Sequence, residues 1–220
     1  MLDIIIKGSW MMVPLLVESV LALAVFMDRF VAFRANARTD TRTLRAKVMA
    51  LLEQDRAEEA LDLCFSTPGP VSAVLAAGIQ SYVKHRSHAK NVEMMRGLIE
   101  DAMEDYTHHA LAAVEKRMNV LAFVGNSAPL FGMTGTVTGM IKSFNAMAGA
   151  GALEGTVVAA GISEALITTA AGLLIALGAV IPYHYFTGNA AKIESEILEA
   201  ASDLLDFVTV RHAGGTEAGV

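Results

Sequence analysis

Three ionisable side chains lie inside long apolar stretches of this sequence, away from the ends of those stretches: Glu18, Lys142 and Glu164. A charged group at membrane depth costs about 2.5 to 3.5 kcal/mol, so it must face a protein interior or a wet cavity. A carboxyl group in such a place tends to be protonated unless it is solvated or paired. The chemistry that these residues indicate is therefore proton binding within a membrane.

Hydroxyl groups lie near Glu164 in the sequence pattern. Counted inward from Lys142 and from Thr156, Thr136 and Glu164 lie roughly 9 to 12 Å deep, and Thr169 lies about 20 Å deep. These three residues predict a polar column between two antiparallel helices. Thr168 shares the helix face of Glu164, and its angular spacing makes it the closer companion. Two alternatives remain open: the hydroxyls bond carbonyls one turn back, or Glu164 is a structural hydrogen-bonding group.

The stretches that carry these residues are long enough to be transmembrane helices. Of the 220 residues, 54% are hydrophobic, and the mean hydropathy of +0.46 is high for a soluble domain. A helix needs roughly 20 mostly apolar residues to cross a bilayer, and residues 9–27, 119–146 and 156–186 meet this requirement. The predicted fold is an all-α membrane protein with three transmembrane helices.

Basic residues predict how these helices are oriented. Only Lys7 precedes the first stretch, whereas a group of basic residues follows it: Arg29, Arg34, Arg38, Arg42, Arg45 and Lys47. Because Lys and Arg concentrate on the cytoplasmic side, residues 28–118 and 187–220 are expected in the cytoplasm. Residues 1–8 and the short link 147–155 are then expected outside.

The region between the first two stretches has helical periodicity. Apolar residues predict short helices around 44–52, 60–64 and 71–83, with a Pro-Gly turn at 67–70 between the last two. From Val92 onward no helix-breaking residue occurs before Pro129, so one helix is expected to run directly into the second transmembrane stretch. The amphipathic pattern after Phe186 predicts that the third stretch also continues as a helix.

Small residues form a stripe along the second and third stretches. Gly132, Gly135 and Gly139 recur at three- and four-residue steps, and Gly172 lies on a similar face of the third stretch. Small residues let helix backbones approach closely in lipid, where hydrophobic association between helices is weak. We expect these four glycines to pack the two helices together.

Other kinds of site are not indicated. His85, His88, His108 and His109 lack a completing set of cysteines or carboxylates, so no metal site and no cofactor are predicted. Cys64, the single cysteine, is expected to be a buried apolar residue. The net charge of −6 argues against nucleic-acid binding. Because no nucleophile lies beside a base, the chain is not expected to be an enzyme.

Several longer motifs resemble the MotA/TolQ/ExbB proton channel family, and in particular its ExbB-like members. They cover most of the chain: PLLVESVLALAVFMDRF at 14–30, EEALDLC at 58–64 before TPGPV, APLFGMTGTVTGMIKSF at 128–144, and GISEALITTAAGLLIALGAVIPYHYF at 161–186. The last two motifs are the most specific ones. Three spans with a cytoplasmic region between the first two fit ExbB-like and TolQ-like members, whereas MotA-like members have four spans.

The resemblance implies a multi-pass protein of the bacterial inner membrane that assembles into a ring-shaped homopentamer. It implies a central lumen lined by Thr136, Glu164 and Thr169, which holds a single-span ExbD-like or TolR-like partner bearing a transmembrane aspartate. Proton flow would then energise a TonB-like protein that drives transport across the outer membrane. Membrane lipids would surround the ring. A TolQ-like role in envelope integrity and cell division, or a non-conducting scaffold, are the alternatives.

Glu18 departs from the family pattern, in which a neutral residue is expected near the middle of the first span. Two interpretations remain open for this acid. It is either protonated and bonded to a neighbouring helix, or it is a second functional carboxyl group.

Overall fold

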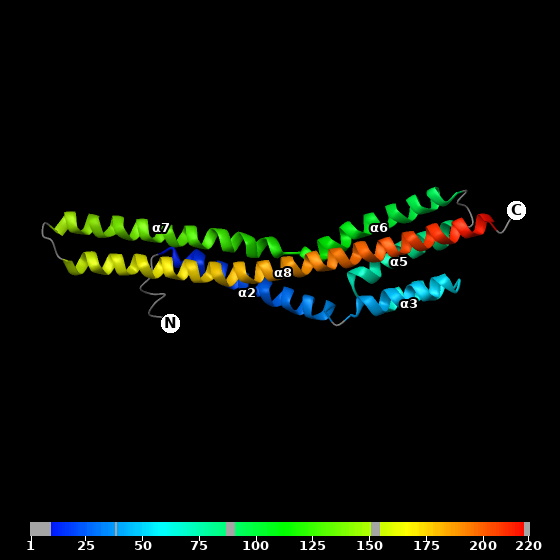
Figure 1. Ribbon diagram of the computed structural model, residues 1–220. Coiled ribbons are helices and arrows are strands. Elements are labelled where there is room, and N and C mark those ends of the chain that lie inside the picture. Colours follow the sequence, from blue (N-terminus) through cyan, green and yellow to red (C-terminus); the bar gives the residue numbers. More distant parts are fainter. Residues whose placement is uncertain (1–9, 38, 87–90, 151–154, 218–220) are drawn as a thin grey trace. The chain divides into compact units, whose positions relative to one another are not determined.

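The computed structural model describes residues 10–37, 39–86, 91–150 and 155–217, and every regular element among them is an α-helix (Figure 1). The prediction of an all-helical fold is confirmed. The helices are α2 (Met12–Asn36), α3 (Thr41–Glu53), α4 (Ala57–Ser66), α5 (Pro70–His85), α6 (Val92–Glu115), α7 (Met118–Ala150) and α8 (Gly155–Glu217).

The chain divides into two compact units. We call Met1–Val31 together with Arg117–Phe186 the apolar unit, and Ala32–Lys116 together with Thr187–Val220 the polar unit. The helices α2 and α8 contribute residues to both units. Each unit has its own interior and is described separately.

The core of the polar unit is made of large aliphatic and thioether side chains. Helix α5 packs against α4 and α6, and the C-terminal part of α8 completes this core. Its large, fully buried side chains include members of four helices: Val48, Leu52, Leu75, Ile79, Met95, Ile99, Ile197 and Leu204. The helices predicted around 44–52, 60–64 and 71–83 are present as α3, α4 and α5, with the turn at 67–69 between the last two.

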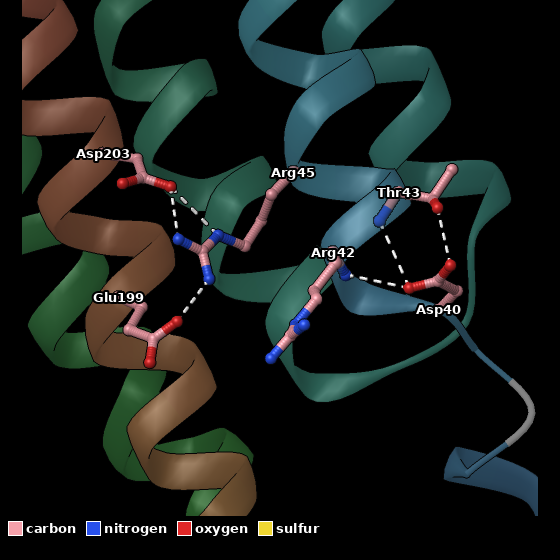
Figure 2. Close-up of polar contacts among 6 residues, drawn as sticks. All are labelled: Asp40, Arg42, Thr43, Arg45, Glu199 and Asp203. Carbon is pink, nitrogen blue, oxygen red and sulfur yellow. Dashed lines mark hydrogen bonds and ion pairs between the residues drawn. The ribbon is translucent and has the colours of Figure 1, made fainter.

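Capping residues explain where α3 and α6 begin. Asp40 precedes α3, and its carboxylate accepts hydrogen bonds from the hydroxyl and backbone N–H of Thr43 and from the backbone N–H of Arg42 (Figure 2). These bonds, led by that of the Thr43 hydroxyl, lower the pKa of Asp40. Asn91 caps α6 in the same way, since its Oδ1 lies 2.8 Å from the N–H of Met94. Each cap satisfies backbone donors that a helix leaves unpaired at its start.

A cluster of ion pairs joins α3 to α8 at the surface of this core. The Arg45 guanidinium donates to Glu199 Oε2 at 2.6 Å and to Asp203 Oδ2 at 2.5 Å (Figure 2). Burial alone would lower the pKa of Arg45, but the hydrogen bonds to Asp203 and Glu199 outweigh it and raise that pKa. Arg211 makes a second link, because it donates to the carbonyl of Leu52 at 2.7 Å.

The prediction of one helix running from Val92 into the second apolar stretch is wrong. Helix α6 ends at Glu115, and α7 begins at Met118. Between them Arg117 takes a left-handed conformation with φ of 65°, which only glycine adopts without cost. Since neither glycine nor proline marks this point, the break leaves no signal in the sequence.

The continuation of the third apolar stretch as a helix is confirmed, because α8 runs without interruption over 63 residues. The apolar stripe predicted after Phe186 supplies Ile197, Leu204 and Val208 to the core of the polar unit. Pro182 lies within α8 and Pro129 within α7, and neither ends its helix.

Within the described residues, two helices are long and apolar enough to cross a bilayer, over Met118–Ala148 and Val158–Arg211. Only 28% of each apolar window is buried, which differs from the mostly buried core helix of a soluble protein. Helix α2 is not among them, and its 25 residues include Glu18, Asp28, Arg29 and Arg34. The count of three spans, and the sides of the membrane assigned to the loops, stay predictions.

Candidate functional site

Helices α7 and α8 approach each other so closely in the apolar unit that their backbones touch. A Cβ atom added at Gly172 would lie 2.6 Å from the carbonyl oxygen of Ala128, and one at Gly132 would lie 3.1 Å from the Cα of Thr169. Neither contact can relax by turning a side chain, because the opposing atoms belong to the backbone. Glycine at both positions is therefore what permits this helix separation.

The same interface continues along both helices. A Cβ at Gly135 would meet the Thr168 side chain at 2.5 Å, and one at Gly139 would lie 3.0 Å from the Cβ of Ala165. Thr168 is fully buried in this contact. The four glycines named from the sequence thus all lie on the α7–α8 interface, each opposite a residue of the other helix.

The three threonine hydroxyls donate to backbone carbonyls in two different ways. Thr136 donates to Met133 at 2.6 Å, and Thr168 donates to Glu164 at 3.0 Å, both within their own helix. Thr169 instead donates across the interface to the carbonyl of Gly132 at 2.9 Å. Thr169 therefore joins α8 to α7, while the oxygen of each hydroxyl can still accept a further hydrogen bond.

Glu164 is paired with a cation on the neighbouring helix. Its Oε1 lies 3.5 Å from Nζ of Lys142, and the exposed fractions of the two side chains are 28% and 60%. Ala165 contacts Gly139, so Glu164 lies about one helical turn from the level of Thr136. Lys142 was recognised in the sequence as an intramembrane cation, but its pairing with Glu164 was not predicted.

The predicted lumen residues lie on two different flanks of the helix pair. At about 100° per residue, Lys142 points about 120° away from Thr136, and Glu164 points about 140° away from Thr169. We call Lys142 and Glu164 the charged flank, and Thr136 and Thr169 the hydroxyl flank. The acid and the two threonines therefore do not converge on one point within a single chain, unlike the column drawn from the sequence.

Helix α2 packs over one side of the α7–α8 pair. Glu18 contacts Ser127 of α7, with Oε1 2.5 Å from its hydroxyl oxygen, and the rings of Phe26 and Phe186 lie 6.0 Å apart. At about 100° per residue, Ser127 projects toward the charged-flank side of α7. Helix α2 therefore lies on that side and leaves the hydroxyl flank to face away from it.

Ser127 was missed by the sequence reasoning. It belongs to neither the glycine stripe nor the threonine set, and only the separation of α2 and α7 in space brings it to Glu18. The polarity of Glu18 itself was the only available signal, because a buried carboxyl requires a partner. Within the described parts of the chain, no group of three or more His, Cys, Asp or Glu side chains could hold a metal ion.

These features define a helical membrane protein with ionisable and hydroxyl groups at the packed faces of two apolar helices. Residues 67–199 match the model of the MotA/TolQ/ExbB proton channel family. The match covers more than half of the chain, which therefore belongs to this family of bacterial membrane proteins.

Named relatives support the same assignment. The chain is 30% identical over 202 residues to the putative biopolymer transport protein ExbB-like 1 of Synechocystis sp., covering 83% of this chain and 69% of that protein. It is 26% identical over 219 residues to the biopolymer transport protein ExbB of Pseudomonas putida, covering 98% and 64%. It is also 34% identical over 111 residues to the Tol-Pal system protein TolQ of Haemophilus influenzae, covering 50% and 47%.

Proposed function

We propose that this chain is the proton-channel subunit of an ExbB-like motor in the bacterial inner membrane, where it couples the proton motive force to TonB-dependent transport across the outer membrane. The observation that carries this proposal is the Lys142–Glu164 pair, 3.5 Å apart, at the edge of a glycine-packed helix interface. An intramembrane acid is expected to mark a proton path, and membership of a proton channel family supports that reading.

The proposal includes a ring of identical copies, of which a pentamer is the form expected from the resemblance. The two flanks of the helix pair support such an assembly. In a ring, the part of the charged flank at Glu164, which lies beyond the Glu18–Ser127 contact of α2 along the helix pair, would face the hydroxyl flank of the next copy, so that Glu164 approaches Thr136 and Thr169 of a neighbour. A lumen lined by all three residues then requires several copies, because one chain holds them apart.

A second protein completes the proton path in this proposal. One acid per chain, without a second ionisable group deeper on the same face, is a poor relay by itself. A single-span ExbD-like or TolR-like partner with a transmembrane aspartate would supply the missing carboxyl group. Each proton crossing the membrane releases about 2.3 kcal/mol per 100 mV, which a TonB-like protein would receive as mechanical work.

Proton flux into liposomes that contain the chain and its co-expressed partner tests the proposal. We expect Glu164→Gln to abolish the flux, and Thr136→Ala and Thr169→Ala each to reduce it. Thr134→Ala is the matched control, because the exposed Thr134 hydroxyl donates to Leu130 within α7 and points away from the α8 interface. Wild-type flux in all three test variants would refute the lumen assignment.

A TolQ-like role in envelope integrity and cell division is the second candidate, favoured by the 34% identity to the Haemophilus influenzae TolQ. The protein that co-purifies with the chain separates the two roles, since a TolR-like partner would indicate the second. A non-conducting scaffold is the remaining alternative, and the same flux assay with wild-type protein would reveal it by an absence of flux.

A further inference from the structure

We propose that Glu18 is a second proton-binding site, in which a protonated carboxyl group donates a hydrogen bond to Ser127 and thereby fastens α2 to α7. This site lies away from the hydroxyl flank and does not depend on the proposed function. It rests on the geometry of three oxygen atoms and on the burial of a fourth.

The first three oxygens make two short contacts that the single proton of the Ser127 hydroxyl cannot both fill. The Ser127 hydroxyl oxygen lies 2.5 Å from Glu18 Oε1 and 2.7 Å from the backbone carbonyl oxygen of Phe123. A hydroxyl has one proton to donate, and a carbonyl can only accept. If Ser127 donates to Phe123, the proton between Ser127 and Glu18 must belong to Glu18. A protonated carboxyl satisfies both contacts, whereas an ionised one leaves two acceptors facing each other.

The fourth oxygen favours the same protonation state. Glu18 is only 5% exposed, and its Oε2 is a buried atom without a hydrogen-bond partner among the described residues. An ionised carboxylate would place part of its charge on this unpaired oxygen. A neutral carboxyl leaves only an unpaired carbonyl oxygen there, which costs much less.

Among the described residues of the apolar unit, the charged groups of α2 and α7 lie too far along the helices to stabilise a carboxylate. On α2, Asp28 and Arg29 pair with each other about 15 Å from Glu18 along the axis. On α7, Lys142 is about 22 Å from Ser127, and Arg117 precedes that helix by about 15 Å from Ser127.

The titratable residues of α8 within the apolar unit lie about 4 to 24 Å from the level of Val180 along the helix axis. Val180 contacts the Gly125 position of α7, near the level of Ser127, and Glu164 is about 24 Å away from Val180 along α8. Tyr183, His184 and Tyr185 lie nearer, from about 4 to 8 Å beyond Val180 along the axis. Over the parts of the chain that the structure describes, the polar contact of Glu18 is with the Ser127 hydroxyl.

Such a bond has a use that the small-residue interface cannot provide. Close backbone contact holds α7 to α8, but α2 lacks a glycine over its described length and presents bulkier side chains. Because hydrophobic association between helices is weak in lipid, a directional hydrogen bond sets the depth and rotation of one helix on another. The Glu18 proton would thus be retained as a structural ligand.

Infrared spectroscopy of the purified full chain in lipid nanodiscs tests the protonation state directly. At neutral pH we expect a carbonyl stretch of a protonated carboxyl in the wild type that is absent from Glu18→Gln. Ser127→Ala should move this band to higher frequency, because the carboxyl loses its hydrogen-bond acceptor. The band should persist in Glu164→Gln, which controls for the other membrane acid. Identical spectra of wild type and Glu18→Gln would overturn the proposal.

Thermal unfolding of the same samples separates a proton-donating group from a merely bulky one. A glutamine amide can donate to Ser127 much as a protonated acid does, so Glu18→Gln should keep the wild-type midpoint. Glu18→Ala should lower it clearly. Equal midpoints for these two variants would refute a hydrogen-bonding role, and if neither variant can be purified, the band shift in Ser127→Ala still decides the protonation state.

Discussion

The helices within the polar unit and those within the apolar unit are held together by opposite kinds of packing. The polar unit buries large side chains such as Leu204 and Ile99, which are fully enclosed. The apolar unit brings α7 and α8 together through residues that have almost no side chain, so that Gly172 faces a backbone carbonyl. Water drives the first arrangement by the hydrophobic effect, while lipid gives no such drive and leaves close contact and hydrogen bonds to hold helices.

Helix α8 shows the contrast within one element, because it serves both units. Leu174 in the apolar unit is 70% exposed, whereas Leu204 in the polar unit has no exposed surface. The same residue type on the same helix is expected to face lipid at one position and a core at the other. This comparison teaches that a buried leucine stabilises the polar unit, whereas an exposed leucine of the apolar unit provides a surface compatible with lipid.

The largest effect is expected from truncating Leu204, with the same truncation of Leu174 as its comparison. Leu204→Ala removes buried atoms and leaves a cavity, so we expect a loss of about 2 to 5 kcal/mol in the free energy of unfolding of the polar unit. Leu174→Ala should change the stability of the apolar unit by less than about 1 kcal/mol. Thermal unfolding in detergent measures both, and a similar loss at the two positions would remove the contrast.

Adding one methyl group to a glycine probes the other side of the comparison. Gly172→Ala places a Cβ 2.6 Å from the carbonyl oxygen of Ala128, so α7 and α8 must separate at a cost of about 1 to 3 kcal/mol. The nearest atoms that Gly78→Ala in the polar unit would meet are Cδ2 of Leu204 and Sδ and Cγ of Met103, which belong to side chains that can turn and not to the backbone.

The control for both glycine variants is Gly178→Ala, because a Cβ at this position of α8 meets no atom within 4 Å. Size-exclusion chromatography after heating compares the three variants with the wild type. The midpoint is the temperature at which half of the folded protein peak is lost. We expect it to fall most for Gly172→Ala, less for Gly78→Ala and not at all for Gly178→Ala. A larger fall for Gly78→Ala than for Gly172→Ala would contradict the backbone-contact argument.

A smaller effect is expected from the ion pairs of the polar unit. Arg45→Ala removes hydrogen bonds to Glu199 and Asp203 (Figure 2). We expect the free energy of unfolding of the polar unit to fall by only about 1 kcal/mol, because both acidic partners are partly exposed. High salt should reduce this loss by screening the pair. Arg42→Ala is the control, because the Arg42 contact with Asp40 is made by its backbone N–H.

Much of the fold could be predicted from the sequence because periodicity and turn residues reflect local physics. The stripe of Leu44, Val48 and Leu52 identified α3, and the Pro-Gly turn before Val71 placed the start of α5. The break at Arg117 could not be predicted in this way. Its left-handed φ of 65° occurs at a residue type that gives no such signal.

The candidate site was predictable as a set of residues, but not as an arrangement. Glycine spacing and the isolated acid named the residues at the α7–α8 interface without reference to neighbours. Whether two residues share a flank depends on how the helices face each other, which depth counting alone ignores. Glu164 therefore meets Lys142 rather than Thr136, and Glu18 meets Ser127, a residue that no pattern in its own helix distinguishes.

The smallest effect concerns Cys64, the single cysteine of the chain. It is 2% exposed in the polar unit, and burial raises the pKa of its thiol to about 11 from the ordinary 9.0. At pH 8 the reactive thiolate is then about a hundredfold scarcer than in an unfolded chain. We expect slow maleimide labelling that accelerates as pH rises, with no change in the fold.

Labelling of the same thiol tests whether the two units open independently of each other. Leu204→Ala should speed labelling of Cys64, because it increases opening of the polar unit, while Gly172→Ala should leave the labelling rate unchanged, since its clash lies in the apolar unit. Mass spectrometry of timed samples measures both rates. Equal acceleration by the two variants would mean that the units open together, and the difference between lipid-facing and water-facing packing would then have no separate thermodynamic expression.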